Sequence, residues 1–144
     1  MISYDDLYDE IHHITELSNI LSYLFKDRSM CDTQISCELF NNYIFLVNKH
    51  IDLVDRNFYS DLLKSSDSHA NTIANNFMSG SVEIKRIIRA CTKQWCTLKK
   101  DHVLKINNHA LFVKDTEQLF AIILQRIQDE TEHLYPVVRE LKQA

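Results

Sequence analysis

The sequence places four ionisable side chains among apolar residues that recur at helical spacing: Glu10, His50, Arg126 and Glu130. A buried carboxylate without a partner is very costly, so Glu130 needs a positive charge beside it. Arg126 precedes it by one helical turn, where side chains meet, and a guanidinium can pair with a carboxylate. We therefore predict a buried polar network of these four residues. The alternative is that Glu10 and Glu130 lie near helix ends, where water reaches them.

Four amphipathic helices must position these residues. Polar stretches predict loops at 27–32, 65–68 and 99–108, which leaves helices at about 4–26, 33–64, 69–98 and 109–141. Gly80 predicts a kink or a close helix contact, and Pro136 a bend or break, because proline lacks a backbone donor. The predicted fold is all-α, an antiparallel up-down-up-down four-helix bundle with short connections.

Composition supports one helical domain. The chain has 144 residues with one Gly and one Pro, so we expect residues 1–144 to form a single domain of long helices. The net charge is -4 and the basic residues are scattered, which argues against a nucleic-acid partner. We find no signal peptide and no apolar run near the roughly 18 residues of a membrane span. We therefore expect a cytoplasmic protein without a membrane partner.

The four cysteines, Cys31, Cys37, Cys91 and Cys96, fit neither a CxxC redox pair nor a paired zinc motif. A reducing compartment keeps them as thiols. We interpret them as small apolar core groups. The alternative is a regulatory thiol pair formed by Cys91 and Cys96.

Two segments carry a residue pattern known from one protein family. Residues 50–63, HIDLVDRNFYSDLL, begin with a His and end in an aromatic-rich stretch. Residues 126–136, RIQDETEHLYP, combine acidic residues with a Leu-Tyr-Pro ending. Together with the order and length of the predicted helices, these segments resemble the hemerythrin-like, or HHE cation-binding, domains over essentially the whole chain.

This resemblance implies a non-heme di-iron site in the bundle core, held by His residues from all four helices and two bridging carboxylates. Carried over position by position, it puts ligand-type residues at His13, His50, His69 and Glu130. These four are the metal ligands that the resemblance implies, and they would serve one ion.

The chain departs from the family at three further positions. Val54 stands where the family has a bridging carboxylate, and Ile73 stands in place of a His. Arg126 occupies another His position, and a guanidinium cannot bind a metal. We interpret Arg126 as supplying the positive charge that iron supplies in the family. On this interpretation no cofactor is favoured, and non-heme iron, mono- or di-iron, is the alternative.

The leading functional hypothesis is a hemerythrin-like cytosolic bundle with a degenerate or lost di-iron site. It would be a sensor or a regulatory or interaction protein, not an enzyme, with a protein partner or a homodimer as its assembly. The alternative is a non-heme iron protein that binds or senses oxygen, nitric oxide or iron through an unusual ligand set.

A third hypothesis comes from two Glu-x-x-His pairs, Glu10 with His13 and Glu130 with His133. Ferritin-like di-iron bundles use this spacing together with an inward Glu from each of the other two helices. The second and third predicted helices offer no such Glu. A ferritin-like oxidase is therefore the weakest of the three hypotheses.

Overall fold

The computed structural model describes residues 3–96 and 103–143, and the regular secondary structure of these residues is helical. It comprises the helices α1 (Tyr4–Phe25), α2 (Arg28–Cys31), α3 (Gln34–Lys64), α4 (Ser68–Trp95) and α5 (His109–Asp129), then a π-helical segment (Glu130–Leu134) and α6 (Tyr135–Gln143). One isolated β-bridge pairs Cys96 with Leu104. The predicted all-α class is confirmed.

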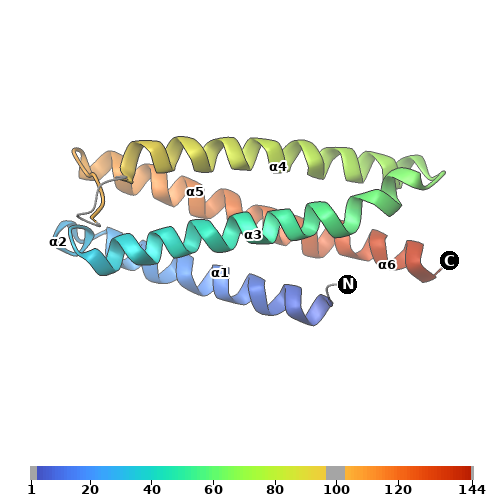
Figure 1. Cartoon of the computed structure of the whole chain (residues 1–144), viewed down its shortest axis with the longest axis horizontal. Helices are drawn as coiled ribbons and strands as arrows, with labels where there is room; N and C mark the ends of the chain where they lie inside the picture. Colours follow the sequence, from blue (N-terminus) through green and yellow to red (C-terminus); the bar gives the residue numbers. More distant parts are fainter. Residues whose placement is uncertain (1–2, 97–102, 144) are drawn as a thin grey trace.

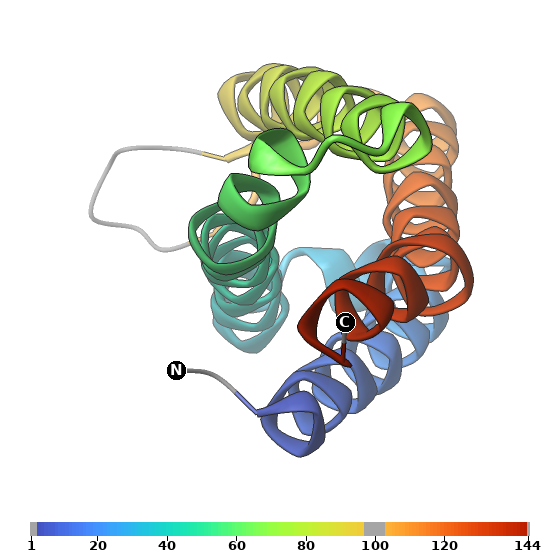
Figure 2. The same ribbon diagram turned by 90° about the vertical axis from the view of Figure 1, so that its right-hand side faces the viewer.

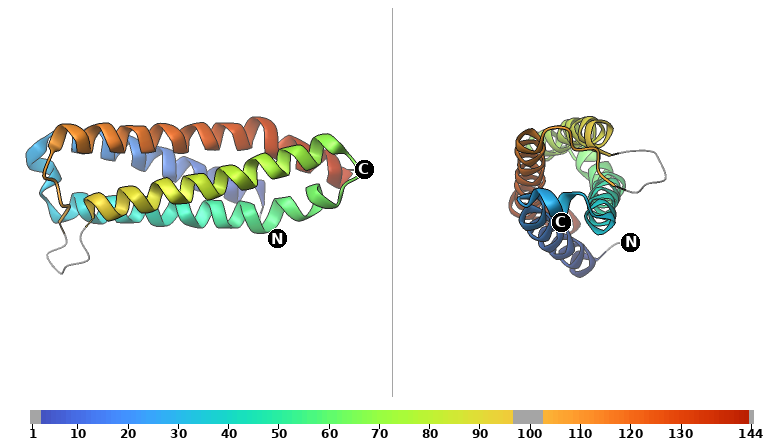
Figure 3. Two further views of the ribbon diagram at one scale, coloured as in Figure 1. Left: turned by 90° about the horizontal axis from the view of Figure 1, so that it is seen from above. Right: turned by 90° about the vertical axis from the view of Figure 1, so that its left-hand side faces the viewer.

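The long helices lie side by side. Figure 1 shows α1, α3, α4 and the continuous column of α5 and α6 aligned along one axis, with α2 at the end opposite the two termini. Seen along that axis, the four columns surround a common interior (Figure 2). The two views in Figure 3 agree with this arrangement. Side chains from distant parts of the sequence therefore meet in one core.

Side-chain oxygens cap the starts of the main helices, where backbone N–H groups lack helical partners. Ser3 accepts a hydrogen bond from the Asp6 N–H. Thr33, Asp67 and Asn108 do the same at the starts of α3, α4 and α5. These caps explain why the helix starts agree well with the sequence pattern.

Three local predictions need correction. Residues 27–32 are not simply a loop, because they contain α2, which Asp27 caps and whose buried Cys31 packs into the core. The third long helix ends at Trp95 and not near Leu98, which lies outside the described residues. In the helix predicted at 33–64, helical spacing puts Ile35 on the apolar face, but Ile35 is 66% exposed and its neighbour Ser36 is buried instead.

The core has two apolar clusters. The larger lies toward α2 and includes the aromatic residues Phe25, Phe40 and Phe112. The smaller lies toward the termini and includes Leu7, Val54, Phe58, Tyr59, Leu62, Phe77, Leu134 and Tyr135. Along α3, Ile51 is the last residue of the first cluster and Val54 the first residue of the second, and His50 directly precedes Ile51. The predicted polar residues therefore fall at the boundary between the two clusters.

Three of the four cysteines, Cys31, Cys37 and Cys91, are buried as predicted. Cys96 is half-buried. Burial raises the pKa of Cys91 to about 12 and that of Cys96 to about 11. A regulatory pair needs a thiolate at neutral pH, so these values argue against that alternative.

Among the described residues, no helix is both long and apolar enough to cross a membrane.

Replacing Phe25 by Ala tests the larger cluster. Phe25 is 1% exposed and contacts the rings of Phe40, Phe112 and Phe120. Loss of this ring leaves a cavity and should lower the free energy of unfolding by about 3–5 kcal/mol. Tyr23→Ala is the control, because Tyr23 lies on the same helix but is 79% exposed, and should cost less than about 0.5 kcal/mol. Urea denaturation measures both, and equal losses would contradict this core.

Candidate functional site

Glu130 is the centre of a buried polar network. Its side chain is 0% exposed, yet both carboxylate oxygens are paired. Oε1 accepts hydrogen bonds from His50 Nε2 at 2.6 Å and from the Tyr135 hydroxyl at 3.1 Å. Oε2 accepts from Arg126 Nε at 2.9 Å. These contacts supply the partners that a buried carboxylate requires.

The backbone beside Glu130 positions one of these partners. Residues 130–134 form a π-helical segment, closed by a hydrogen bond from the Tyr135 N–H to the Glu130 carbonyl. Pro136 follows in the first turn of α6, where its missing N–H is tolerated. Of the predicted bend or break at Pro136, a break is not present: the helix continues into α6, and its winding changes just before Pro136. The π-helical turn leaves Tyr135 fully buried, with its hydroxyl on Glu130.

His50 joins two carboxylates. It is 2% exposed, its Nδ1 lies 2.6 Å from Glu10 Oε1, and its Nε2 lies 2.6 Å from Glu130 Oε1. Burial disfavours the charged ring, but the hydrogen bonds and charges of Glu10 and Glu130 outweigh it and raise the pKa of His50 to about 9. His50 is therefore an imidazolium at neutral pH and donates from both nitrogens.

Arg126 is the second cation of the network and is only 7% exposed. Besides Glu130, it donates from Nη1 to the Phe77 carbonyl at 3.0 Å and from Nη2 to Tyr59 Oη at 2.9 Å and Ser81 Oγ at 2.8 Å. Its guanidinium carbon also lies 4.8 Å from the centre of the Phe77 ring. Arg126 thus crosses the interior from α5 to α3 and α4.

Gly80 makes room for this guanidinium. A Cβ atom at Gly80 would lie 2.8 Å from Arg126 Nη1, closer than real Cβ contacts allow. The close-contact alternative predicted for Gly80 is therefore the one present in the structure. Its helical cost of about 1 kcal/mol relative to Ala is offset by the contacts that Arg126 makes.

The charges of the network balance. Glu10 and Glu130 carry two negative charges, and Arg126 and protonated His50 carry two positive charges. Burial opposes ionisation of Glu130, but His50 and Arg126 outweigh it and lower the pKa of this carboxyl. The structure thus brings together the four residues that the sequence assigned to one network.

The predicted metal ligands do not converge. His13 and His69 are exposed, whereas His50 and Glu130 are buried in contact with each other. In the described part of the chain, no group of three or more His, Cys, Asp or Glu side chains could hold a metal ion. Of the four residues His13, His50, His69 and Glu130, the structure therefore brings only His50 and Glu130 together.

The residues present do not fit a di-iron centre either. Both nitrogens of His50 face carboxylates, so neither offers a lone pair to a metal. Val54 is fully buried in an apolar cluster, and its side chain has no atom that could coordinate a metal. The Arg126 guanidinium bonds the carboxylate that would bridge the ions. We therefore derive no chemistry through bound iron.

Sequence reasoning missed several members of the network. Tyr59, Ser81 and Tyr135 each bond Arg126 or Glu130, and the Phe77 carbonyl accepts from Arg126. A signal existed for two of them, because Ser81 follows the single Gly of the chain and Tyr135 belongs to the Leu-Tyr-Pro ending. The Phe77 carbonyl is a backbone group, so the residue types in the sequence could not identify it as a member of the network.

Comparison with known proteins gave no match to a family model, to a curated protein or to a solved structure.

Removal of Arg126 tests the buried ion pair. Arg126→Met leaves Glu130 with one cation fewer and should lower the free energy of unfolding by about 3–5 kcal/mol. Arg126→Met combined with Glu130→Gln should recover much of this loss, because both charges are then gone. Urea denaturation of both variants measures the coupling.

The matched control is Arg86→Met, because Arg86 pairs with Glu83 on the exposed surface of α4. It should unfold close to the wild type, as expected for a surface ion pair. An Arg126→Met variant as mild as Arg86→Met would contradict the buried pair.

The elevated pKa of His50 predicts a pH-dependent stability. A group whose pKa rises from 6.5 to about 9 on folding stabilises the protein fully below pH 6.5, and this contribution is lost as pH rises to 9. At about 1.4 kcal/mol per pKa unit, the loss is about 3 kcal/mol. Denaturation at several pH values measures it. His50→Gln should abolish this slope, whereas the exposed His13→Gln should keep it; an unchanged slope in His50→Gln would rule out His50 as the source.

Proposed function

We propose that this chain is a metal-free relative of the hemerythrin-like domains, with an antiparallel up-down-up-down four-helix bundle forming one domain. In this proposal a salt-bridge network takes the place of the di-iron centre, and the protein is a sensor or a regulatory or interaction protein. Its surroundings are the cytoplasm, and its partner is another protein or a second copy of the chain.

The observation that carries the proposal is the Arg126–Glu130 pair at 2.9 Å in the core, with His50 on the other carboxylate oxygen. The segments around His50 and Glu130 are those that resemble the family. Positive charge is therefore present at the family's carboxylate position without a metal. The side-by-side packing of four long helical columns supports the bundle topology.

Burial supports a binding role over a catalytic one. His50 and Glu130 are at most 2% exposed, and each of their ionisable atoms already has a partner. A catalytic acid or base must come within hydrogen-bond distance of its substrate. A network without a free ionisable atom instead holds the helices in one arrangement. This suits a protein that acts by binding a partner at its surface or by binding a ligand.

Iron content tests the proposal. Protein produced with added iron and purified in air should contain substoichiometric iron and lack the strong near-ultraviolet absorption of a bridged di-iron site. Added ferrous iron should leave its melting temperature unchanged, because a metal raises that temperature only by binding the native state. About two irons per chain, with that absorption, would favour the non-heme iron alternative.

A further inference from the structure

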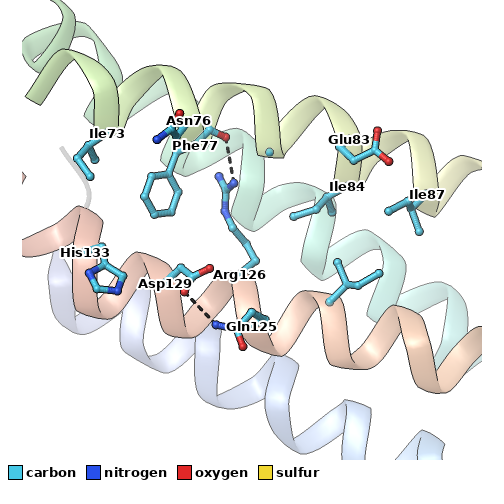
Figure 4. A pocket seen from close by; sticks show the side chains of 12 residues that line it. Ile73, Asn76, Phe77, Glu83, Ile84, Ile87, Gln125, Arg126, Asp129 and His133 are labelled. Atoms are coloured by element: carbon cyan, nitrogen blue, oxygen red, sulfur yellow. Dashed lines mark hydrogen bonds between the residues drawn. The ribbon is translucent and has the colours of Figure 1, made fainter. Parts of the chain in front are cut away.

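A groove between α4 and α5 leads to Arg126. Its volume is about 550 Å³, within the range of roughly 300–1,000 Å³ typical of small-molecule sites. Isoleucine side chains from both helices line it, together with Phe77 and Gly80. Figure 4 shows Arg126 reaching across the groove from α5 toward the Phe77 carbonyl on α4. An apolar groove thus has one charged donor at its base.

Arg126 has one N–H left for a ligand. A guanidinium carries five N–H groups. Its bonds to Glu130, the Phe77 carbonyl, Tyr59 and Ser81 use four of them, and only one of the two on Nη1 is used. Among the described residues, the second Nη1–H has no acceptor. A ligand that covers this charged donor without supplying an acceptor pays its desolvation cost, so a ligand that supplies an acceptor there is favoured over one that does not.

Because Gly80 has no side chain, a ligand in the groove can reach Nη1 of Arg126. Gly80 and Arg126 both line the groove, and the position of a Cβ on Gly80 lies 2.8 Å from Nη1. Any larger residue would therefore cover or displace the atom that carries the unpaired N–H. The only glycine of the chain stands where a ligand needs an opening to Arg126.

The charges around the groove select a neutral ligand. Glu83 and Asp129 line it, the His133 ring that also lines it lies 3.8 Å from the Glu132 carboxylate, and the charge of Arg126 is matched by Glu130. An anion entering the groove would meet two carboxylates and no unmatched cation. A neutral oxygen accepts the Nη1–H without this repulsion.

We propose that the groove binds a neutral, mainly apolar small molecule whose single acceptor oxygen, such as a ketone oxygen, bonds Arg126 Nη1. This site is open to the surface and does not depend on whether the buried centre holds iron. It supplies a ligand class for the sensor role proposed above. If the groove does not bind such a molecule, the expected result of the iron test is unchanged.

The probe for this site is 6-propionyl-2-(dimethylamino)naphthalene, a neutral ketone whose fluorescence shifts to the blue in an apolar site. Binding is measured by titrating it into the intact protein. Displacement then compares three naphthalenes of similar size: 2-acetylnaphthalene, 2-ethylnaphthalene and 2-naphthoate. We expect the ketone to compete at least about tenfold better than the hydrocarbon, because only the ketone accepts a charge-assisted hydrogen bond, and better than the carboxylate.

Two variants locate the site. Gly80→Ala should abolish the preference for ketone over hydrocarbon, whereas Ser79→Ala, at the exposed neighbouring position, should keep it. Ile122→Trp should fill the groove from α5 and weaken all ligands at least about tenfold, without changing a network residue.

Several results would overturn the proposal. The first is that the probe does not bind. The second is that the ketone and the hydrocarbon displace the probe equally well, or that the carboxylate displaces it best. The third is that Ile122→Trp binds the probe as well as the wild type does. If Gly80→Ala does not fold by circular dichroism, the wild-type competition and Ile122→Trp still decide the outcome.

Discussion

The need to neutralise one carboxylate in the core governs the interior of this protein. Glu130 is fully buried, and an ionised acid there is tolerated only with partners of opposite charge. His50 and Arg126 supply that charge, and Glu10 balances the second cation. The network lies between two apolar clusters, so it interrupts a core that would otherwise be continuous. Buried ion pairs seldom add net stability over apolar packing, which points to a role in specifying the fold.

The same network ties together every long helical column. Glu10 comes from α1, His50 and Tyr59 from α3, Ser81 from α4, and Arg126 from α5. Each interhelical hydrogen bond forms only when the two helices that it joins are aligned in one way along their axes. Apolar side chains tolerate small sliding motions better than paired charges do. We therefore interpret the network as the feature that sets the helices in register.

Arg126 links this interior to the surface. Its guanidinium is held by Glu130, Tyr59, Ser81 and the Phe77 carbonyl, and it lines the groove beside Gly80. Occupation of the groove would act on the residue that also bonds the buried carboxylate. A ligand that binds Arg126 better in one helix arrangement than in another would shift the balance between them. The groove and the network therefore form one physical unit.

Sequence alone determined the features that depend on short separations along the chain. Helical periodicity and the polar stretches between helices located the long helices. The i,i+4 spacing identified the Arg126–Glu130 pair, because neighbours on a helix meet wherever that helix packs. Tertiary structure decided which distant groups complete the site. It placed His13 and His69 in solvent and brought Tyr59, Ser81 and the Phe77 carbonyl to Arg126. Periodicity states which residues share a face of one helix, whereas the rotation and height of each helix against its neighbours depend on the packing of the whole core.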